Sequence, residues 1–225
     1  MKESGYPYWA MEIIWLGHSC FVIKGKQKAI ITDPYHPDLA PSLDHPGADV
    51  VTISHFHPGH SYVEGVANNP RQIKGPGEYE IGGMFITGIG TFHDNDKGKL
   101  RGKNTIYLIE MDGLTLCHLG DLGHALPSQL IEEIGNVDVL FLPAGEVSTI
   151  SIDTAVETVR QLEARIVIPM HYKSAFVNKQ LEPVSKFLTK MGVPELESRP
   201  KLSITSSSLP ASTQVVLLEF KGQSA

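Results

Sequence analysis

The sequence has few cysteines, no long apolar run and no excess of basic residues. Its 225 residues include two cysteines, Cys20 and Cys117, which excludes a disulfide-rich scaffold. Each lies in an apolar, strand-like run, so both are predicted to be small core residues rather than partners in a disulfide. No apolar stretch approaches the ~20 residues of a membrane-spanning helix, and the polar start before Met11 lacks the apolar centre of a secretory signal. We therefore expect a cytoplasmic protein.

The charge balance argues against nucleic acid and anionic membranes as general partners. The chain has 19 Lys and Arg against 25 Asp and Glu, a net charge of −6. With 41% hydrophobic and 20% charged residues, its composition is that of an ordinary globular protein. A domain usually has ~100–200 residues, so the length favours one large domain. We expect residues 1–10 to be a loose extension and residues 11–225 to form a single domain.

Short strand-like runs dominate the first half of the chain, and helical segments follow later. The predicted helices are 127–134, 151–163 and 180–191, with Ser151 or Asp153 as a candidate N-cap of the second. Several strands precede the first helix, which favours a mixed-sheet α/β fold with helices on its outer faces over a regular βαβ array. Residues 34–48 and 206–212 are predicted loops. The predicted strands are 12–16, 20–24, 28–32, 49–54, 84–87, 105–110, 114–119, 137–142, 165–169 and 214–220.

Ten histidines are many for this length, and their placement matters more than their number. Residues 53–63 read ISHFHPGHSYV, so that His55, His57 and His60 come directly after the apolar run DVVTIS. In an extended strand His55 and His57 point to the same side, and the Pro-Gly turn can bring His60 beside them. The alternative is three exposed loop histidines that contact nothing. Three imidazoles that leave one buried strand together favour a metal site.

Three further segments end in the same way. His93 follows the run MFITGIGTF, His118, Asp121 and His124 lie in LTLCHLGDLGH, and His171 follows IVIPM. Strand ends are a common location of functional sites in sheet-based folds. Taken singly, each segment reads equally well as a loop histidine, a turn aspartate or a satisfied core histidine. Four such segments in one chain predict an assembled site.

Taken together, HxHxxH, a lone His, Gly-Asp and a late Pro-x-His resemble the metallo-β-lactamase fold superfamily. More narrowly, the chain is similar to a branch of metal-dependent hydrolases that includes relatives of the ascorbate-6-phosphate lactonases. WLGHSCFVI followed by ITDP resembles the opening hairpin of that branch, KNTIYLIEMDGLTLCHLGDLGH its middle segment and VIPMHY its last ligand strand. The resemblance implies a four-layer αββα sandwich of two mixed β-sheets, with the site at one edge of the sheets.

The resemblance also implies a role for each ligand-type residue. Asp33, in the Thr-Asp-Pro turn, would orient a ligand imidazole through its free N–H group. His18, in Gly-His-Ser, is expected near the site without an assigned task. The catalytic candidates are Asp121, His60 and His171. The implied ligands are His55, His57 and His93 for a first metal and His60 and His171 for a second, with Asp121 bridging the two.

The chain departs from the family pattern at Gly59. The usual motif is HxHxDH, in which the Asp ligates the second metal and helps to orient the attacking water. Because glycine can do neither, we expect a first metal that binds firmly and a second that binds weakly or only with substrate. His118 or His124 could compensate for the missing ligand. Both could equally face the substrate or be hydrogen-bonded structural histidines.

Such a centre predicts hydrolysis, because a divalent ion held by imidazoles activates water and polarises a substrate oxygen. The bond would be a phosphodiester, lactone, thioester or amide in a small-molecule substrate. Zinc is the expected metal, with manganese, iron or nickel as alternatives. A nuclease of the same fold and a non-enzymatic metal-binding or sensing protein are the competing interpretations. Lys103, Tyr172 and Lys173 flank ligand segments and could meet an anionic substrate or be solvated surface; the family also includes homo-oligomers.

Overall fold

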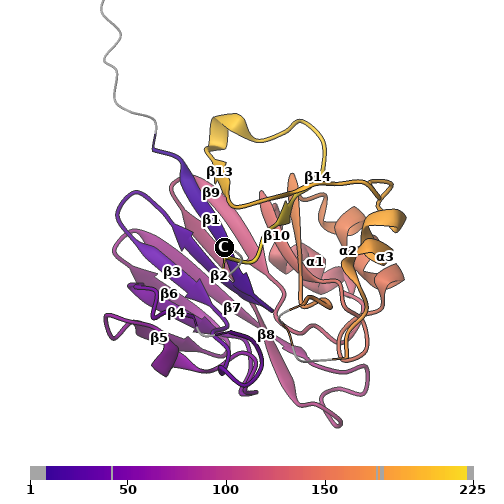
Figure 1. The fold of residues 1–225 in the computed structure, drawn as a ribbon, viewed down its shortest axis with the longest axis horizontal. Coiled ribbons are helices and arrows are strands. Elements are labelled where there is room, and N and C mark those ends of the chain that lie inside the picture. Colours follow the sequence, from indigo (N-terminus) through magenta and orange to yellow (C-terminus); the bar gives the residue numbers. More distant parts are fainter. Residues whose placement is uncertain (1–8, 42, 176, 178–179, 222–225) are drawn as a thin grey trace, which may run out of the picture.

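Two β-sheets enclose a shared core in the computed structural model, which describes residues 9–41, 43–175, 177 and 180–221 (Figure 1). Apart from Trp9 and Ala10, the predicted N-terminal extension lies outside the described residues. The first sheet has six strands and mixes parallel with antiparallel pairs. In spatial order they are β13 (Leu202–Ile204), β1 (Met11–Gly17), β2 (Cys20–Lys24), β3 (Ala29–Thr32), β4 (Val50–Ile53) and β5 (Arg71–Lys74).

The second sheet has seven strands and is also mixed. In spatial order they are β14 (Gln214–Val215), β11 (Ile166–Met170), β10 (Val139–Pro143), β9 (Leu114–His118), β8 (Lys103–Met111), β7 (Met84–Phe92) and β6 (Gly77–Ile81). Neighbours are antiparallel from β6 to β9 and parallel from β9 to β14. A separate two-stranded ribbon joins β12 (Ser198–Arg199) to β15 (Leu217–Leu218).

Apolar side chains from both sheets meet in the space between them. Phe21 of β2 packs on Phe141 of β10, with ring centroids 4.6 Å apart. Tyr107 of β8 is fully buried, and its hydroxyl donates a hydrogen bond of 2.9 Å to the carbonyl of Ile53 on β4. Because side chains alternate along a strand, each sheet also has an outer face to cover. The two sheets are thus fixed to each other by packing and by a hydrogen bond near the site.

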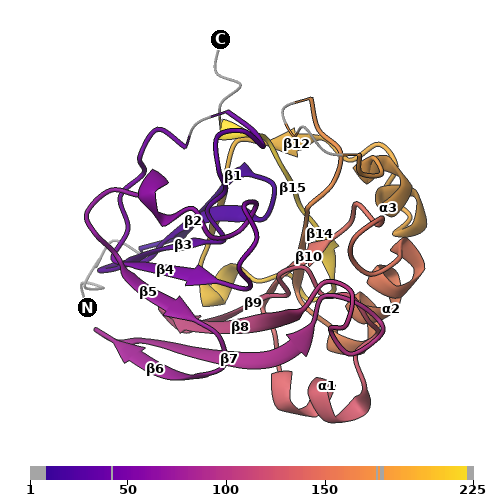
Figure 2. The same cartoon turned by 90° about the horizontal axis from the view of Figure 1, so that it is seen from below.

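The two outer faces are covered differently. The helices α1 (Ser128–Ile134), α2 (Ile152–Leu162) and α3 (Val184–Lys190) all pack on the seven-stranded sheet (Figure 2). The outer face of the six-stranded sheet packs against the loop 34–48, through Tyr35 and Leu43, and against the short 3-10 helix η1 (Val63–Gly65). Proline interrupts this loop repeatedly and is unfavourable inside a helix, which explains why this outer layer is irregular in the part described.

The predicted mixed sheets are confirmed, and most predicted strands and helices agree within a few residues. Helix α3 begins at Val184 rather than Gln180, because Pro183 disfavours a helical conformation in the residue before it. The predicted strand 214–220 is wrong as one unit, since β14 and β15 pair with different strands. Among the described residues, no helix is long and apolar enough to cross a membrane. The elements absent from the prediction are β5, β6, β12, β13 and the 3-10 helices η1 and η2 (Ser206–Ser208).

Candidate metal centre

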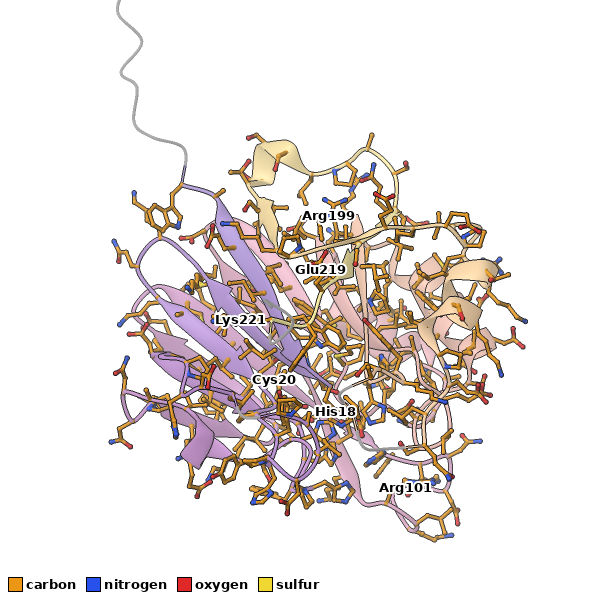
Figure 3. The ribbon with its side chains drawn as sticks, in the orientation of Figure 1. His18, Cys20, Arg101, Arg199, Glu219 and Lys221 are labelled. Atoms are coloured by element: carbon orange, nitrogen blue, oxygen red, sulfur yellow. The ribbon has the colours of Figure 1, made fainter. Side chains whose placement is uncertain are left out.

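Six segments meet at one edge of the two sheets. Strands β3 and β4 are parallel, as are β9, β10 and β11, so each set ends at the same edge. In Figure 3, His18 lies in the turn between β1 and β2, toward the opposite end of the molecule from Arg199 and Glu219. The segments bring together His18, Asp33, the run from His55 to His60, His93, Asp121 and His171.

Asp121 lies at the centre of this arrangement. Its Oδ2 atom is 3.2 Å from Nε2 of His60 and 3.2 Å from Nε2 of His171. The same oxygen is 3.3 Å from Nε2 of His93 and 3.8 Å from Nε2 of His55. All five residues are buried. A single carboxylate oxygen therefore faces four imidazole nitrogens contributed by both sheets.

The histidines form two groups around Asp121. Within each group, the nitrogens that could bind a metal lie within 4.8 Å of one another. The first group matches the set predicted for the first metal, and the second adds His18 to the two histidines predicted for the second. The role of these residues as ligands stays a prediction. The first group is His55, His57 and His93, and the second is His18, His60 and His171.

A tight turn after β4 explains how His60 reaches the second group. The amide of His57 donates to the carbonyl of His55 (3.1 Å), and the amide of His60 donates to that of His57 (2.9 Å). The Ser61 hydroxyl donates a third bond of 2.9 Å to the His57 carbonyl. Phe56, between the first two histidines, points outward and is 70% exposed. The turn thus leaves His55 and His57 in the first histidine group and brings His60 into the second.

Asp33 holds the end of β4 in place. Its Oδ1 accepts a hydrogen bond from the Ser54 amide (2.8 Å), and its Oδ2 accepts from the Ser54 hydroxyl and lies 2.8 Å from Nδ1 of His60. One of its oxygens lies within 4.8 Å of ring nitrogens of His55 and His60 and could join them in binding a metal. Both Asp33 oxygens, however, already accept hydrogen bonds. Asp33 therefore fixes the His60 ring so that its Nε2 faces Asp121. The sequence did not single out Ser54, for which its place directly before HxH was the available signal.

Asn104 is a second supporting residue that the sequence did not reveal. Its Oδ1 accepts a hydrogen bond of 2.9 Å from the Asp121 amide, and its Nδ2 donates to Thr91 Oγ1 (2.9 Å) and to the Leu119 carbonyl (3.0 Å). Gly120 lies against the Asn104 side chain with a φ of +57°, and a Cβ at this position would lie 2.4 Å from Asn104 Oδ1. The one signal in the sequence was a polar residue at the start of an apolar strand.

Three residues of the centre have an unusual backbone conformation. The backbone φ angles of these residues lie in the left-handed region, which residues other than glycine rarely adopt. The values are 51° for His18, 39° for Asp33 and 52° for His171. Such strain persists where the surroundings fix it, and it is common at functional sites. The carbonyl of His18 accepts hydrogen bonds from the His171 amide (3.0 Å) and from Trp15 Nε1 (3.1 Å). These bonds fix His18 next to the end of β11.

His118 and His124 make hydrogen bonds to the backbone and belong to neither group. Nε2 of His118 lies 2.9 Å from the Ser19 carbonyl, and its Nδ1 accepts from the Gly120 amide (3.2 Å). Nδ1 of His124 lies 2.9 Å from the Ala125 carbonyl. The geometry therefore favours structural roles for both histidines over compensation for Gly59.

The space beside Gly59 is occupied by His18. A Cβ atom built on Gly59 would lie 2.9 Å from Nε2 and 3.2 Å from Cδ2 of the His18 ring. It would also lie 3.3 Å from Cδ2 of Leu39. Real Cβ atoms essentially never approach another atom within 3.0 Å. Any side chain at position 59 would therefore compete with His18 for the same volume.

The electrostatics of the centre favour a bound cation. Burial would raise the pKa of Asp121, but the His171 and His60 imidazoles outweigh it and hold this pKa well below its ordinary value. Burial would lower the pKa of His60, yet the carboxylates of Asp121 and Asp33 raise it to about 9. Burial, and then the neighbouring His60, lower the pKa of His55. Two buried carboxylates thus favour positive charge in this centre, either on a protonated His60 or on a cation that replaces its proton, whereas His55 stays neutral, the form that binds metals.

The residues present fit a divalent metal. Asp121 Oδ1 and His55 Nε2 are buried and have no hydrogen-bond partner among the described residues. Buried polar atoms are nearly always satisfied, and a cation would satisfy both. Imidazoles with a carboxylate are a donor set suited to zinc and similar ions.

The remaining residues singled out in the sequence belong to neither histidine group. Cys20 and Cys117 are buried with free thiols, which confirms their prediction as core residues. Tyr172 is buried against Trp15, with ring centroids 5.1 Å apart. The interpretation of this residue as solvated surface was wrong, because an aromatic partner from β1 covers it. Lys103 and Lys173 are exposed.

Comparison with known proteins agrees with the fold and with a metal-dependent hydrolase. A family model described as a beta-lactamase superfamily domain matches residues 12–171. A protein of Archaeoglobus fulgidus named "UPF0173 metal-dependent hydrolase" is 27% identical over 215 residues, covering 81% of this chain and 93% of the relative. A solved structure from Thermotoga maritima, assigned as a Zn-dependent hydrolase of the metallo-β-lactamase superfamily, is 38% identical with a TM-score of 0.76 and covers 93% of this chain and 98% of that chain.

More distant structures share the fold. A metallo hydrolase from Ignicoccus hospitalis is 21% identical with a TM-score of 0.62, covering 87% of this chain and 97% of that chain. The narrower resemblance to ascorbate-6-phosphate lactonases stays a prediction. The match over residues 12–171, the two mixed sheets and the site at their edge lead to one conclusion: the chain belongs to the beta-lactamase superfamily and has the metallo-β-lactamase fold.

Proposed function

We propose that this chain, a metal-dependent hydrolase of the metallo-β-lactamase superfamily, uses two metal sites to hydrolyse an ester-type bond in a small molecule. The bond is a phosphodiester, lactone, thioester or amide. The position of Asp121 supports the proposal most directly, because its Oδ2 lies within 3.8 Å of imidazole nitrogens from both histidine groups. One carboxylate placed in this way can serve both sites.

The residues divide the work between the two sites. His55, His57 and His93 would hold the first ion, and His60 and His171 would hold the second, with the Asp121 carboxylate serving both sites. Divalent ions at these sites would lower the pKa of a water molecule and polarise the substrate's carbonyl or phosphoryl oxygen. Asp121 Oδ1, buried without a hydrogen-bond partner among the described residues, is available to accept a hydrogen bond from that water and so to orient it.

Two features of the proposal concern the metals. Zinc is the proposed metal because the donors are mostly imidazoles, and manganese, iron and nickel are the alternatives. Position 59 supplies no carboxylate to the second group, so the second ion would bind more weakly than the first. Asp33 orients His60 through the hydrogen bond of 2.8 Å to Nδ1 and so supports the second site.

Metal content and turnover of model substrates test the proposal together. Purified protein is analysed for bound metals and then assayed with bis-p-nitrophenyl phosphate, a set of lactones, a thioester and a β-lactam, each with added Zn²⁺ or Mn²⁺. We expect one class to be turned over, with activity lost in Asp121→Asn and kept in His45→Ala, which removes an exposed histidine of the loop 34–48. Metal binding without turnover of any class would instead support a binding or sensing protein.

A further inference from the structure

His18 has no role in the proposed hydrolysis, yet its surroundings are those of a metal ligand. It is fully buried, and its donor nitrogens lie within 4.8 Å of those of His60 and His171. Its ring is tilted against both of them, with centroids 4.2 Å from His171 and 4.9 Å from His60. Three imidazoles at this spacing match the three protein ligands typical of a catalytic zinc site.

The backbone of His18 is strained, and hydrogen bonds hold it in this conformation. A histidine with φ 51° is in a strained conformation, and such strain persists only where neighbouring contacts over-determine it. The two hydrogen bonds accepted by its carbonyl, from the Trp15 indole and the His171 amide, supply those contacts. One of them comes from another member of the same histidine group, so the two residues are positioned together.

Gly59 explains why this space is available to an imidazole. A Cβ at position 59 would lie 2.9 Å from His18 Nε2, the ring atom that faces this position. The φ of Gly59 is outside the left-handed region, so the backbone does not itself require glycine. What excludes a side chain here is the His18 ring. The absence of a side chain at 59 and the presence of an imidazole at 18 are therefore two parts of one arrangement.

We propose that His18 is a ligand of the second metal and takes the place of a donor from position 59. The proposal rests on the two-metal function above and changes its expected chemistry. The second site then has three imidazoles and the shared carboxylate of Asp121, instead of an additional carboxylate. Because imidazoles favour zinc, iron and nickel and carboxylates suit manganese, this donor set selects zinc over manganese at the second site.

Metal stoichiometry in four variants tests this assignment. Each protein is stripped of metal and titrated with Zn²⁺ by calorimetry, and bound zinc is counted by elemental analysis after gel filtration. Wild type should bind two equivalents, and His18→Ala one. The double variant Gly59→Asp with His18→Ala should regain the second equivalent, since the new carboxylate enters the volume that the ring has left. His45→Ala is the matched control and should bind two equivalents.

Gly59→Ala tests the proposal with every ligand retained. The added methyl displaces the His18 ring, so the affinity for the second Zn²⁺ should fall at least ~10-fold, the lower end of what the loss of a supporting contact at a metal site produces. Thermal melts of metal-free proteins establish that each variant is folded. If His18→Ala fails to fold, the affinity of Gly59→Ala for the second Zn²⁺ decides whether His18 is a ligand.

The outcomes separate this proposal from the proposed function. Two equivalents bound by His18→Ala with wild-type affinity, or an unchanged second affinity in Gly59→Ala, would overturn the assignment of His18. A wild type that binds one Zn²⁺ and still hydrolyses a substrate would overturn it as well and leave metal-dependent hydrolysis standing. A wild type that binds no metal would remove both. Mn²⁺ titration followed by electron paramagnetic resonance adds a second readout, with tighter Mn²⁺ binding expected in the double variant than in wild type.

Discussion

Asp33 shows how one carboxylate can organise a candidate metal site through hydrogen bonds to a predicted ligand and to the strand end that precedes it. It is fully buried, and it joins three groups of the β4 end: the Ser54 amide, the Ser54 hydroxyl and the His60 imidazole. A histidine ligand is positioned through its second ring nitrogen, and a carboxylate partner there also strengthens the ligand nitrogen. His60 is the imidazole that Asp33 orients in this way, and its Nε2 faces Asp121 at 3.2 Å.

Replacing this carboxylate by an amide should weaken metal binding without unfolding the protein. Asp33→Asn replaces one of the two accepting oxygens by an NH2 group, which opposes either the Ser54 amide at Oδ1 or the His60 Nδ1–H at Oδ2. We expect the affinity for Zn²⁺ to fall about 10–100-fold, the range seen when outer partners of metal ligands are removed. Competition with a chelating dye measures the change. Asp49→Asn is the control, because Asp49 also accepts a backbone N–H, from Ala29, but lies on the exposed surface; equal affinities in the two variants would contradict the role given to Asp33.

At this scale the sequence predicts residue types better than it predicts contacts. Histidines at the ends of apolar runs stand out in the sequence, and the structure brings six of them together, whereas His118 and His124 make structural hydrogen bonds. Asn104 and Ser54 are common polar residues, and nothing in the sequence shows that their partners are Asp121 and Asp33. The contact between Gly59 and His18 joins residues 41 positions apart in the chain, and it depends on the pairing of β2, β3 and β4 in one sheet.

At the scale of elements, the loop after β7 is organised by one side chain. Asp94, the residue after His93, is buried and accepts hydrogen bonds from the amides of residues 96, 98, 100 and 101, at 2.7 to 2.9 Å. Burial alone would raise the pKa of Asp94, but these four amides outweigh it and lower it to about 2. The carboxylate therefore stays charged at neutral pH and closes the loop directly behind a predicted metal ligand.

Removing this carboxylate should open the loop to proteolysis. Lys97, Lys99 and Arg101 are exposed in the loop and are sites for trypsin. Asp94→Ala leaves four amides without their acceptor, so we expect cleavage at these residues to become severalfold faster, measured by mass spectrometry of timed digests at pH 8. Asp96→Ala, which removes only an exposed ion pair with Lys99, is the control. Equal cleavage of Asp94→Ala and the control would show that the loop is held by other contacts.

The elements that the sequence predicts are those with a strong apolar pattern. Strand β10 is buried at all five positions and β4 at all four, and both were predicted from their apolar runs. Strand β5 buries one of its four residues, Ile73, and exists because β4 offers it a parallel partner. Its pattern is that of a polar loop. Such strands depend on tertiary pairing, which a single sequence does not display.

At the scale of the whole molecule, the candidate metal centre draws its residues from both sheets. His55, His57 and His60 follow a strand of the six-stranded sheet, whereas His93, Asp121 and His171 follow strands of the seven-stranded one. An ion bound between them links segments that only the folded chain brings together. Metal binding and folding are then coupled, since the unfolded chain has no site of comparable affinity.

This coupling predicts a metal-dependent melting temperature. A ligand at 100 times its dissociation constant stabilises the native state by ~2.7 kcal/mol, which corresponds to a shift of about 5–10 °C for a domain of this size. We expect chelation followed by dialysis to lower the melting temperature by this amount, and stoichiometric Zn²⁺ to restore it, measured by differential scanning calorimetry. Asp121→Asn lacks the residue shared by both histidine groups, so its melting temperature should respond much less to Zn²⁺. A wild type that melts at the same temperature with and without bound zinc would show that the two sheets are fixed by their core alone, through contacts such as Phe21 on Phe141.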